Sequence, residues 1–366
     1  MMQEKRWVGI LVFCMTMGHA IGQVYTDKPK VLKDTTSYNS LLPIFGKKVK
    51  ELGFDLPYSA GISVNYLWQK SEISISNVNV GFNNSPLYDV DELINFNSTT
   101  AESHGVNIRP DIWVFPFLNV YGIFAKAQSK TNVDVSIWIP RINESEEIFS
   151  IQTNPEFNTT TAGFGITPTA GFFGGWIAFD MNFTWTDVDA QEKPVFAFVF
   201  DPRIGKTFNF AKPNRNISFW VGAFRLKVNR DTRGNLALGE VFPITEWDQK
   251  ITSGQDSVGE AQVELDTWWE ALSPVEQRNP VNIVKREGNQ KKLDVAATFL
   301  NAAENAVDTA DNSTLQYSLD KKQKSMWNFV VGSQFQLNKS WMIRAEYGHA
   351  SGRDQVFCGL QYRFDL

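Results

Sequence analysis

The chain has 366 residues, of which 13% are aromatic and 20% are charged, and its formal net charge is −5. So many aromatic side chains argue against disorder, because they can bury enough apolar surface to fold. The two cysteines exclude a disulfide-stabilised scaffold, and the acidic balance excludes nucleic acid as a partner. The length allows two domains or one large β-barrel.

Residues 1–22 predict a secretory signal peptide. Two basic residues precede an apolar run over 7–17, and small residues precede a predicted cleavage site before Gln23. The run is shorter than the ~20 apolar residues that a membrane-spanning helix needs. We therefore expect export, and the exported chain keeps a single cysteine, Cys358, without a disulfide partner.

The segment 23–57 is expected to be periplasmic and to precede the main fold. A polar stretch leads into a short amphipathic segment, Ser40 to Leu52, which predicts a short helix. This helix would either pack at the end of the main fold or act as a plug or partner-binding element.

From Tyr58 onward the hydrophobic pattern has a period of two, which is typical of β-strands with one apolar face. Between 176 and 187, for example, large apolar residues at odd positions alternate with Ala178, Asp180, Asn182 and Thr184. The runs exceed the ~5–6 residues of an average soluble strand. Their length suits the ~9–11 residues of a tilted strand that crosses a membrane.

The pattern predicts an antiparallel transmembrane β-barrel of ten strands over 58–366, placed in the cell outer membrane. The predicted strands are 58–70, 104–115, 117–130, 161–172, 176–187, 195–210, 216–229, 323–337, 341–350 and 355–366. Short turns alternate with longer loops, as in outer-membrane barrels. Two loop pieces, 73–82 and 133–139, also alternate, and they leave open either hairpins above the membrane or a barrel of twelve strands. A soluble barrel with its apolar face inward is the competing interpretation.

The loop 230–322 differs from the rest, because it shows helical periodicity and carries 16 acidic residues against 10 basic ones. We expect an acidic helical insert between the seventh and eighth strands. It would pack on itself, cover the mouth of the barrel, or present a binding surface.

Charged residues of both signs fall on the face predicted to line the lumen. They are Arg109, Asp111, Lys126, Asp180, Asp201, Arg203, Arg344 and Glu346. A lumen enclosed by ten to twelve strands is narrow, so these side chains would form ion pairs across it or line a small pore. A wide general porin would need ~16–18 strands.

The last predicted strand carries Leu360, Tyr362, Phe364 and Leu366 in one register. This resembles the signal by which the barrel-assembly machinery recognises outer-membrane barrels, so that machinery and outer-membrane lipid are expected partners. The stretches 344–348, 362–364 and 111–119, with Arg353 nearby, resemble an uncharacterised group of Gram-negative outer-membrane barrels. The resemblance implies an outer-membrane barrel and offers no activity.

His349 and Ser351 form an H-x-S pair that resembles the one in the lipid A deacylase barrel, where the histidine acts as base and the serine as nucleophile. No spacing of histidine and cysteine indicates a metal site, and we expect no cofactor.

The first functional hypothesis is therefore a narrow or gated channel, or a scaffold, whose helical insert covers or controls the barrel and which passes a small solute. The alternatives are a surface protein that binds an extracellular partner through the insert and loops, and a lipid A-modifying hydrolase that uses His349 and Ser351. Enzymatic activity is therefore not the favoured hypothesis.

Overall fold

The computed structural model describes residues 40–51, 56–172, 174–189, 191, 193–228, 231–238, 244–308 and 313–366. The predicted signal peptide and the polar stretch before residue 40 lie outside these residues. In chain order the elements are α2 (Gly46–Glu51), β1 (Ala60–Phe82), β2 (Tyr88–Asp89), β3 (Ile94–Phe115), β4 (Leu118–Pro140), β5 (Ser145–Thr153), β6 (Glu156–Phe172), β7 (Gly175–Val188), β8 (Val195–Asn209), β9 (Asn216–Val228), β10 (Asp231–Ala237), α4 (Ile244–Ala271), α5 (Pro280–Val307), β11 (Thr314–Gln323), β12 (Trp327–Gln336), β13 (Trp341–Ala350) and β14 (Arg353–Phe364).

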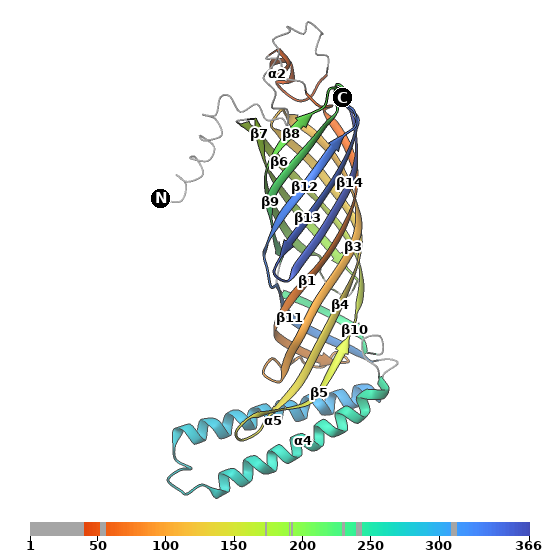
Figure 1. The fold of residues 1–366 in the computed structure, drawn as a ribbon. Helices are drawn as coiled ribbons and strands as arrows, with labels where there is room; N and C mark the ends of the chain where they lie inside the picture. The colour runs from red at the N-terminus through yellow and green to blue at the C-terminus, as the bar shows by residue number, and fades with distance from the viewer. Residues whose placement is uncertain are drawn as a thin grey trace, which may run out of the picture.

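Ten strands close into an antiparallel barrel, which confirms the predicted fold class (Figure 1). Around the wall their order is β1, β14, β13, β12, β9, β8, β7, β6, β4 and β3. The pairing of β1 with β3, from Ala60 opposite Ile112 to Glu72 opposite Thr100, completes the circle. Closure leaves no open edge within the barrel, so every strand there has a hydrogen-bonded neighbour on both sides.

The stretches 73–82 and 133–139 are continuations of barrel strands and add no strands to the wall. Beyond Glu72, β1 leaves β3 and pairs with β11, from Ile73 opposite Gln323 to Phe82 opposite Leu315. Beyond residue 131, β4 pairs with β5 on one side while it still pairs with β3 on the other. The barrel therefore has ten strands, and three of them project beyond it.

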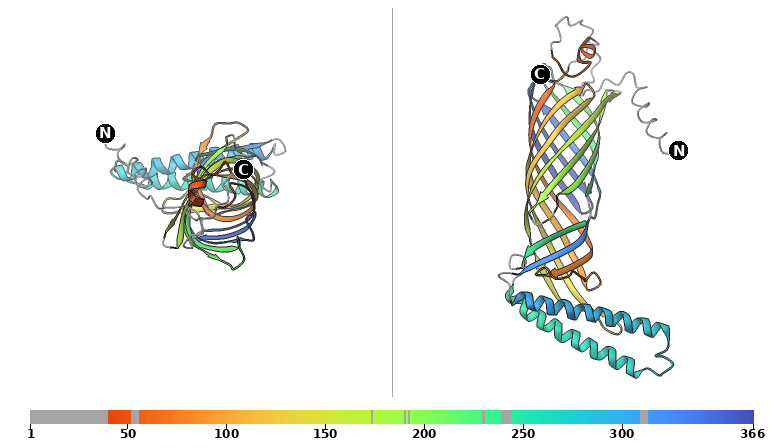
Figure 2. Two further views of the ribbon diagram at one scale, coloured as in Figure 1. Left: turned by 90° about the horizontal axis from the view of Figure 1, so that it is seen from above. Right: turned by 180° about the vertical axis from the view of Figure 1, so that it is seen from behind.

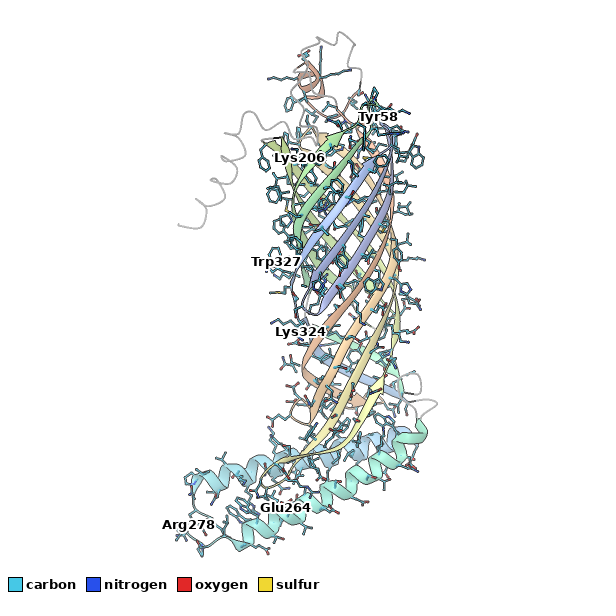
Figure 3. All side chains as sticks on the ribbon, in the orientation of Figure 1. Tyr58, Lys206, Glu264, Arg278, Lys324 and Trp327 are labelled. Carbon is cyan, nitrogen blue, oxygen red and sulfur yellow. The ribbon has the colours of Figure 1, made fainter. Side chains whose placement is uncertain are left out.

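Apolar side chains cover the outside of the barrel, and polar side chains face its lumen. Phe124, Phe164, Phe329 and Ile343 are among the large apolar residues exposed on the outer face, while the lumen-facing Asp180, Asp201 and Asn328 are buried. Figure 3 shows aromatic and aliphatic side chains on the outer wall between the levels of Lys206 and Trp327. This is the arrangement of a barrel that crosses a lipid bilayer, because lipid accepts only apolar side chains.

The first described residues, from Ser40 onward, meet the C-terminus at one end of the barrel, which we call the terminal end (Figure 1). The backbone N–H of Leu41 donates to the carbonyl of Leu366 at 3.1 Å, and that of Ile44 donates to Val114 at 2.9 Å. The ring of Phe45 stacks on Phe115 with 6.1 Å between centroids. The short helix α2 is thus attached to the rim of the barrel.

At the opposite, distal end the projecting strands and the described residues of 231–323, namely 231–238, 244–308 and 313–323, build a second folded part, which we call the distal unit (Figures 1 and 2). It comprises the outer parts of β1, β3 and β4 with β2, β5, β10, β11 and the α4–α5 hairpin. Its apolar core joins Val80 and Ile139 of the sheet to Leu265 and Leu300 of the helices. Among the described residues, no helix is both long and apolar enough to cross a membrane.

The sidedness of the wall can be tested with one substitution on each face. Phe164→Arg places a charge against lipid and should lower the free energy of unfolding by about 2–4 kcal/mol. Thr184→Arg, on the lumen face opposite Gly163, should cost far less. Chemical denaturation of the barrel in lipid vesicles measures both costs, and equal costs would contradict the assigned faces.

Candidate functional site

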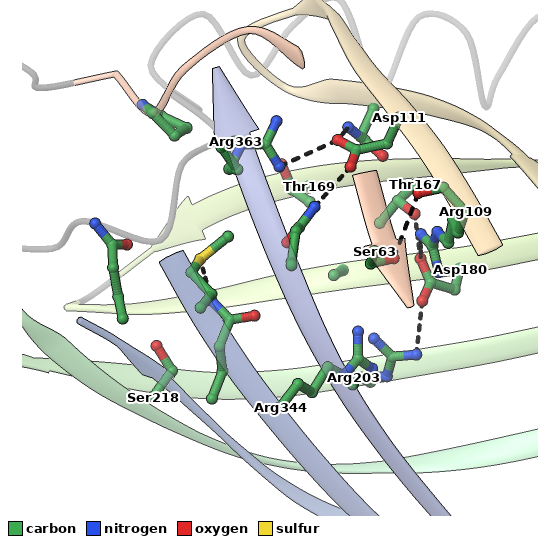
Figure 4. A pocket seen from close by; sticks show the side chains of 18 of the residues that line it. Ser63, Arg109, Asp111, Thr167, Thr169, Asp180, Arg203, Ser218, Arg344 and Arg363 are labelled. Carbon is green, nitrogen blue, oxygen red and sulfur yellow. Dashed lines mark hydrogen bonds and ion pairs between the residues drawn. The ribbon is translucent and has the colours of Figure 1, made fainter. Parts of the chain in front are cut away.

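The lumen is crossed by an ion-pair network centred on Arg203 of β8. The guanidinium lies 2.6 Å from Asp180 on β7 and 3.4 Å from Glu346 on β13, and it also pairs with Asp201 on its own strand. Arg344 lies 3.0 Å from Glu346, and Arg109 of β3 lies 3.9 Å from Asp180. Because β3, β7–β8 and β13 belong to separate parts of the wall, the network bridges the lumen (Figure 4).

Large inward side chains fill the space around this network. The indole N–H of Trp220 donates to Glu346 at 2.9 Å, and the hydroxyl of Tyr121 donates to Asn182 at 2.5 Å. Both rings lie over glycines of neighbouring strands. A Cβ at Gly332 would stand 2.3 Å from Trp220, and one at Gly165 would stand 2.3 Å from Tyr121. The glycines therefore make room for the aromatic rings that narrow the lumen.

A second polar cluster lies nearer the terminal end and is centred on Asp111. Its carboxylate lies 3.1 Å from Arg363 and accepts hydrogen bonds from Asn119 at 2.8 Å and from Gln361 at 2.6 Å. Figure 4 shows Arg363 and Asp111 facing one another, apart from the Arg203–Asp180 pair. Asp111 was predicted for the lumen, whereas its partner Arg363 was not singled out, although it shares the inward parity of Gln361.

Between these two clusters lies a cavity of ≈190 Å³. Polar side chains make up much of its wall, and Trp176, Trp220, Met342 and Phe357 give it apolar surfaces. Trp176 is 6% exposed and packs against Trp220 with 6.0 Å between ring centroids. The sequence pattern could have placed Trp176 inward, because it has the parity of Asp180 on the same strand.

Seven of the eight predicted lumen residues lie on the inner face, and Lys126 does not. Lys126 is exposed and has the parity of the outward Phe124 on β4. The prediction was wrong because it followed the charge of Lys126 and not its parity with Phe124, which places both side chains on the outer face of β4. Lys126 follows the last large apolar residue on that face, so it marks where the apolar band ends.

Arg353 is a buried cation at the distal end of the lumen that the site prediction did not include. Its side chain is 1% exposed and donates to Gln69 at 2.7 Å and to Gln323 at 3.0 Å. The guanidinium carbon lies 4.8 Å from the ring centroid of Phe224. Arg353 thus joins β14, β1 and β11 at the point where the barrel passes into the distal unit.

His349 lies on the outer face of β13, close to its distal end. Its Nδ1 lies 2.7 Å from a carboxylate oxygen of Asp354, which also accepts a hydrogen bond from the Tyr347 hydroxyl at 2.9 Å. Ser351 lies in the turn that follows, next to Gly352 with its positive φ of 78°. The imidazole is therefore held by a carboxylate on the next strand, while the serine belongs to the turn.

Within the described ranges, no group of three or more histidine, cysteine, aspartate or glutamate side chains is arranged to hold a metal ion.

Comparisons with solved structures return outer-membrane β-barrels. No protein-family model matches the chain, and no curated protein matches it. Among solved structures, the translocator domain of the autotransporter NalP from Neisseria meningitidis is 8% identical, with 87% of this chain and 93% of that chain covered and a TM-score of 0.32. The transport unit of the autotransporter AIDA-I from Escherichia coli is 9% identical, with 84% and 90% covered and a TM-score of 0.30.

The Ralstonia pickettii toluene transporter TbuX is 8% identical, with 84% of this chain and 90% of that chain covered and a TM-score of 0.28. These similarities concern general barrel architecture, so the function has to be argued from the residues of this chain.

The close packing of Trp220 on Gly332 gives a direct test of the lumen. Gly332→Ala should displace the indole, break its bond to Glu346 and lower the free energy of unfolding by about 1–3 kcal/mol. Gly259→Ala is the matched control, because a Cβ at Gly259 of α4 meets nothing within 4 Å and alanine favours a helix. Chemical denaturation measures the free energy of unfolding of both variants. If Gly332→Ala loses no more of this free energy than Gly259→Ala does, the packing is contradicted.

Proposed function

We propose that the protein is a narrow, gated channel of the outer membrane, with the distal unit outside the cell and the terminal end in the periplasm. The observation that carries this proposal is the ion-pair network of Arg203, which bridges the lumen next to a polar cavity. In the conformation described, the network is the gate in its closed state.

The chemistry of the network favours a polar pathway over a merely filled interior. Desolvation makes buried ion pairs weak stabilisers, and well-packed apolar side chains of similar volume often serve stability equally well. Three carboxylates and the guanidinium of Arg203 nevertheless lie buried together. Charges also exchange partners and admit water more readily than packed apolar side chains. Such charged groups are therefore expected in a lumen that passes small polar solutes.

Removing the shared cation should open this gate. In Arg203→Gln the carboxylates of Asp180, Asp201 and Glu346 lose the charge between them and repel one another. We expect this variant to conduct more current than the wild type in planar bilayers, with longer open times.

Lys130→Gln is the control, because Lys130 pairs with Glu156 at 3.1 Å on the outer face and leaves the lumen unchanged. Glu346→Gln tests the same gate without leaving the carboxylates unopposed. Absence of conductance from the wild type and from both gate variants, all of them folded and inserted, would refute the channel.

A second function, binding of an extracellular partner, is favoured by the shape and surface of the α4–α5 hairpin. Arg141 in the β4–β5 turn holds α4 through Glu260 at 3.3 Å and Glu264 at 3.7 Å, and the rest of the hairpin extends sideways from the barrel (Figure 2). Val281 and Val284, one helical turn apart on α5, are 71% and 69% exposed. Exposed apolar residues on one helix face are typical of contact surfaces.

Site-specific crosslinking tests this second function. A photo-crosslinking amino acid at Val284 in intact cells should give one defined adduct, and replacement of 267–291 by a short Gly-Ser loop should abolish partner binding while the barrel keeps its conductance. The same amino acid at Lys130, exposed on the barrel wall, is the control. Equal adducts from both positions, or none from Val284, would argue against a binding role of the hairpin.

A further inference from the structure

The cavity in the lumen contains hydrogen-bond donors that the protein does not use. The indole Nε1 of Trp176 and the Nε of Arg344 are buried, and neither has a hydrogen-bond partner within the described part of the chain. Both residues line the cavity. A buried donor without an acceptor costs free energy, which a bound acceptor would recover.

The residues that carry these two donors both lie next to the ring of Trp220. The Trp176 ring lies 6.0 Å from Trp220 between centroids, and the guanidinium carbon of Arg344 lies 4.9 Å from the centroid of the Trp220 ring. Trp220 already uses its own N–H on Glu346. The Trp220 ring is therefore flanked by residues of β7 and β13 that each carry an unused donor.

The charges that face the cavity have an excess of cations. Four arginines and two aspartates line it, namely Arg109, Arg203, Arg344, Arg363, Asp111 and Asp180. The other two carboxylates of the lumen, Asp201 and Glu346, do not line it and are bound to Arg203 or Arg344. The four arginines and four carboxylates of the lumen balance in charge, but the surface that a ligand meets is rich in N–H donors, which suits a carboxylate acceptor.

The remaining walls suit an organic molecule. Phe357 and Met342 add apolar surface to the cavity wall, and a cavity of ≈190 Å³ holds one small organic molecule or several waters. A flat apolar group packs well on an indole face.

We propose that this cavity binds a small organic carboxylate. The carboxylate accepts hydrogen bonds from Trp176 Nε1 and Arg344 Nε, and the apolar part of the molecule packs on Trp220. Binding at this site does not require permeation, so the proposal is independent of whether the lumen conducts ions.

Benzoate is a suitable probe, and benzamide is its uncharged counterpart of the same shape. Isothermal titration of the purified full-length protein in detergent should show saturable binding of benzoate at one site. Benzamide should bind at least about 10-fold more weakly, because its amide oxygen accepts weaker hydrogen bonds than an ionised carboxylate does. This comparison uses the wild-type protein and needs no variant to fold.

Trp176→Phe keeps an aromatic ring and removes the N–H donor together with the five-membered ring of the indole. It should weaken benzoate binding by about 10- to 100-fold. Trp341→Phe is the matched control, because Trp341 lies on the outer face, and its affinity should equal that of the wild type. Equal affinity for benzoate and benzamide, unchanged affinity in Trp176→Phe, or no saturable binding would each overturn the proposal.

Discussion

The structure depends on one constraint, which is that a strand inside lipid must pair its backbone groups on both sides. The pairing of β1 with β3 over Ala60–Glu72 meets this constraint by closing the circle. Closure forces alternate residues of every strand either outward or into the lumen. The apolar outer wall, the polar lumen and the crossing ion pairs all follow from that single geometric condition.

Release from the same constraint explains the distal unit. Beyond the distal end of the barrel, water can satisfy backbone groups, so strands no longer need a partner within a closed circle. There β1 changes its partner from β3 to β11, and β4 acquires β5. The resulting open sheets bury an apolar face against α4 and α5, with Leu265 and Leu300 in the core. One set of strands thus contributes to a membrane wall and to a water-exposed fold.

The lumen combines tight packing with incomplete satisfaction of polar groups. Glycines such as Gly332 and Gly165 admit large rings, and those rings with the Arg203 network close the passage. Beside them the donors of Trp176 and Arg344 remain without acceptors. An interior that served only to fill the barrel would gain nothing from such groups, which is why the proposals for gating and for carboxylate binding rest on the same region.

The sequence alone determined the fold class and the face of most side chains, because alternation is a local property that every strand repeats, whereas the choice between ten and twelve strands needed the strand pairing. It located the helical segment and seven of the eight proposed lumen residues for the same reason. Only the tertiary structure decided that Arg203 meets Asp180 and Glu346, and that Trp176 and Arg344 border one cavity. Those contacts depend on the register between strands far apart in the chain, and a period-two pattern carries no information about that register.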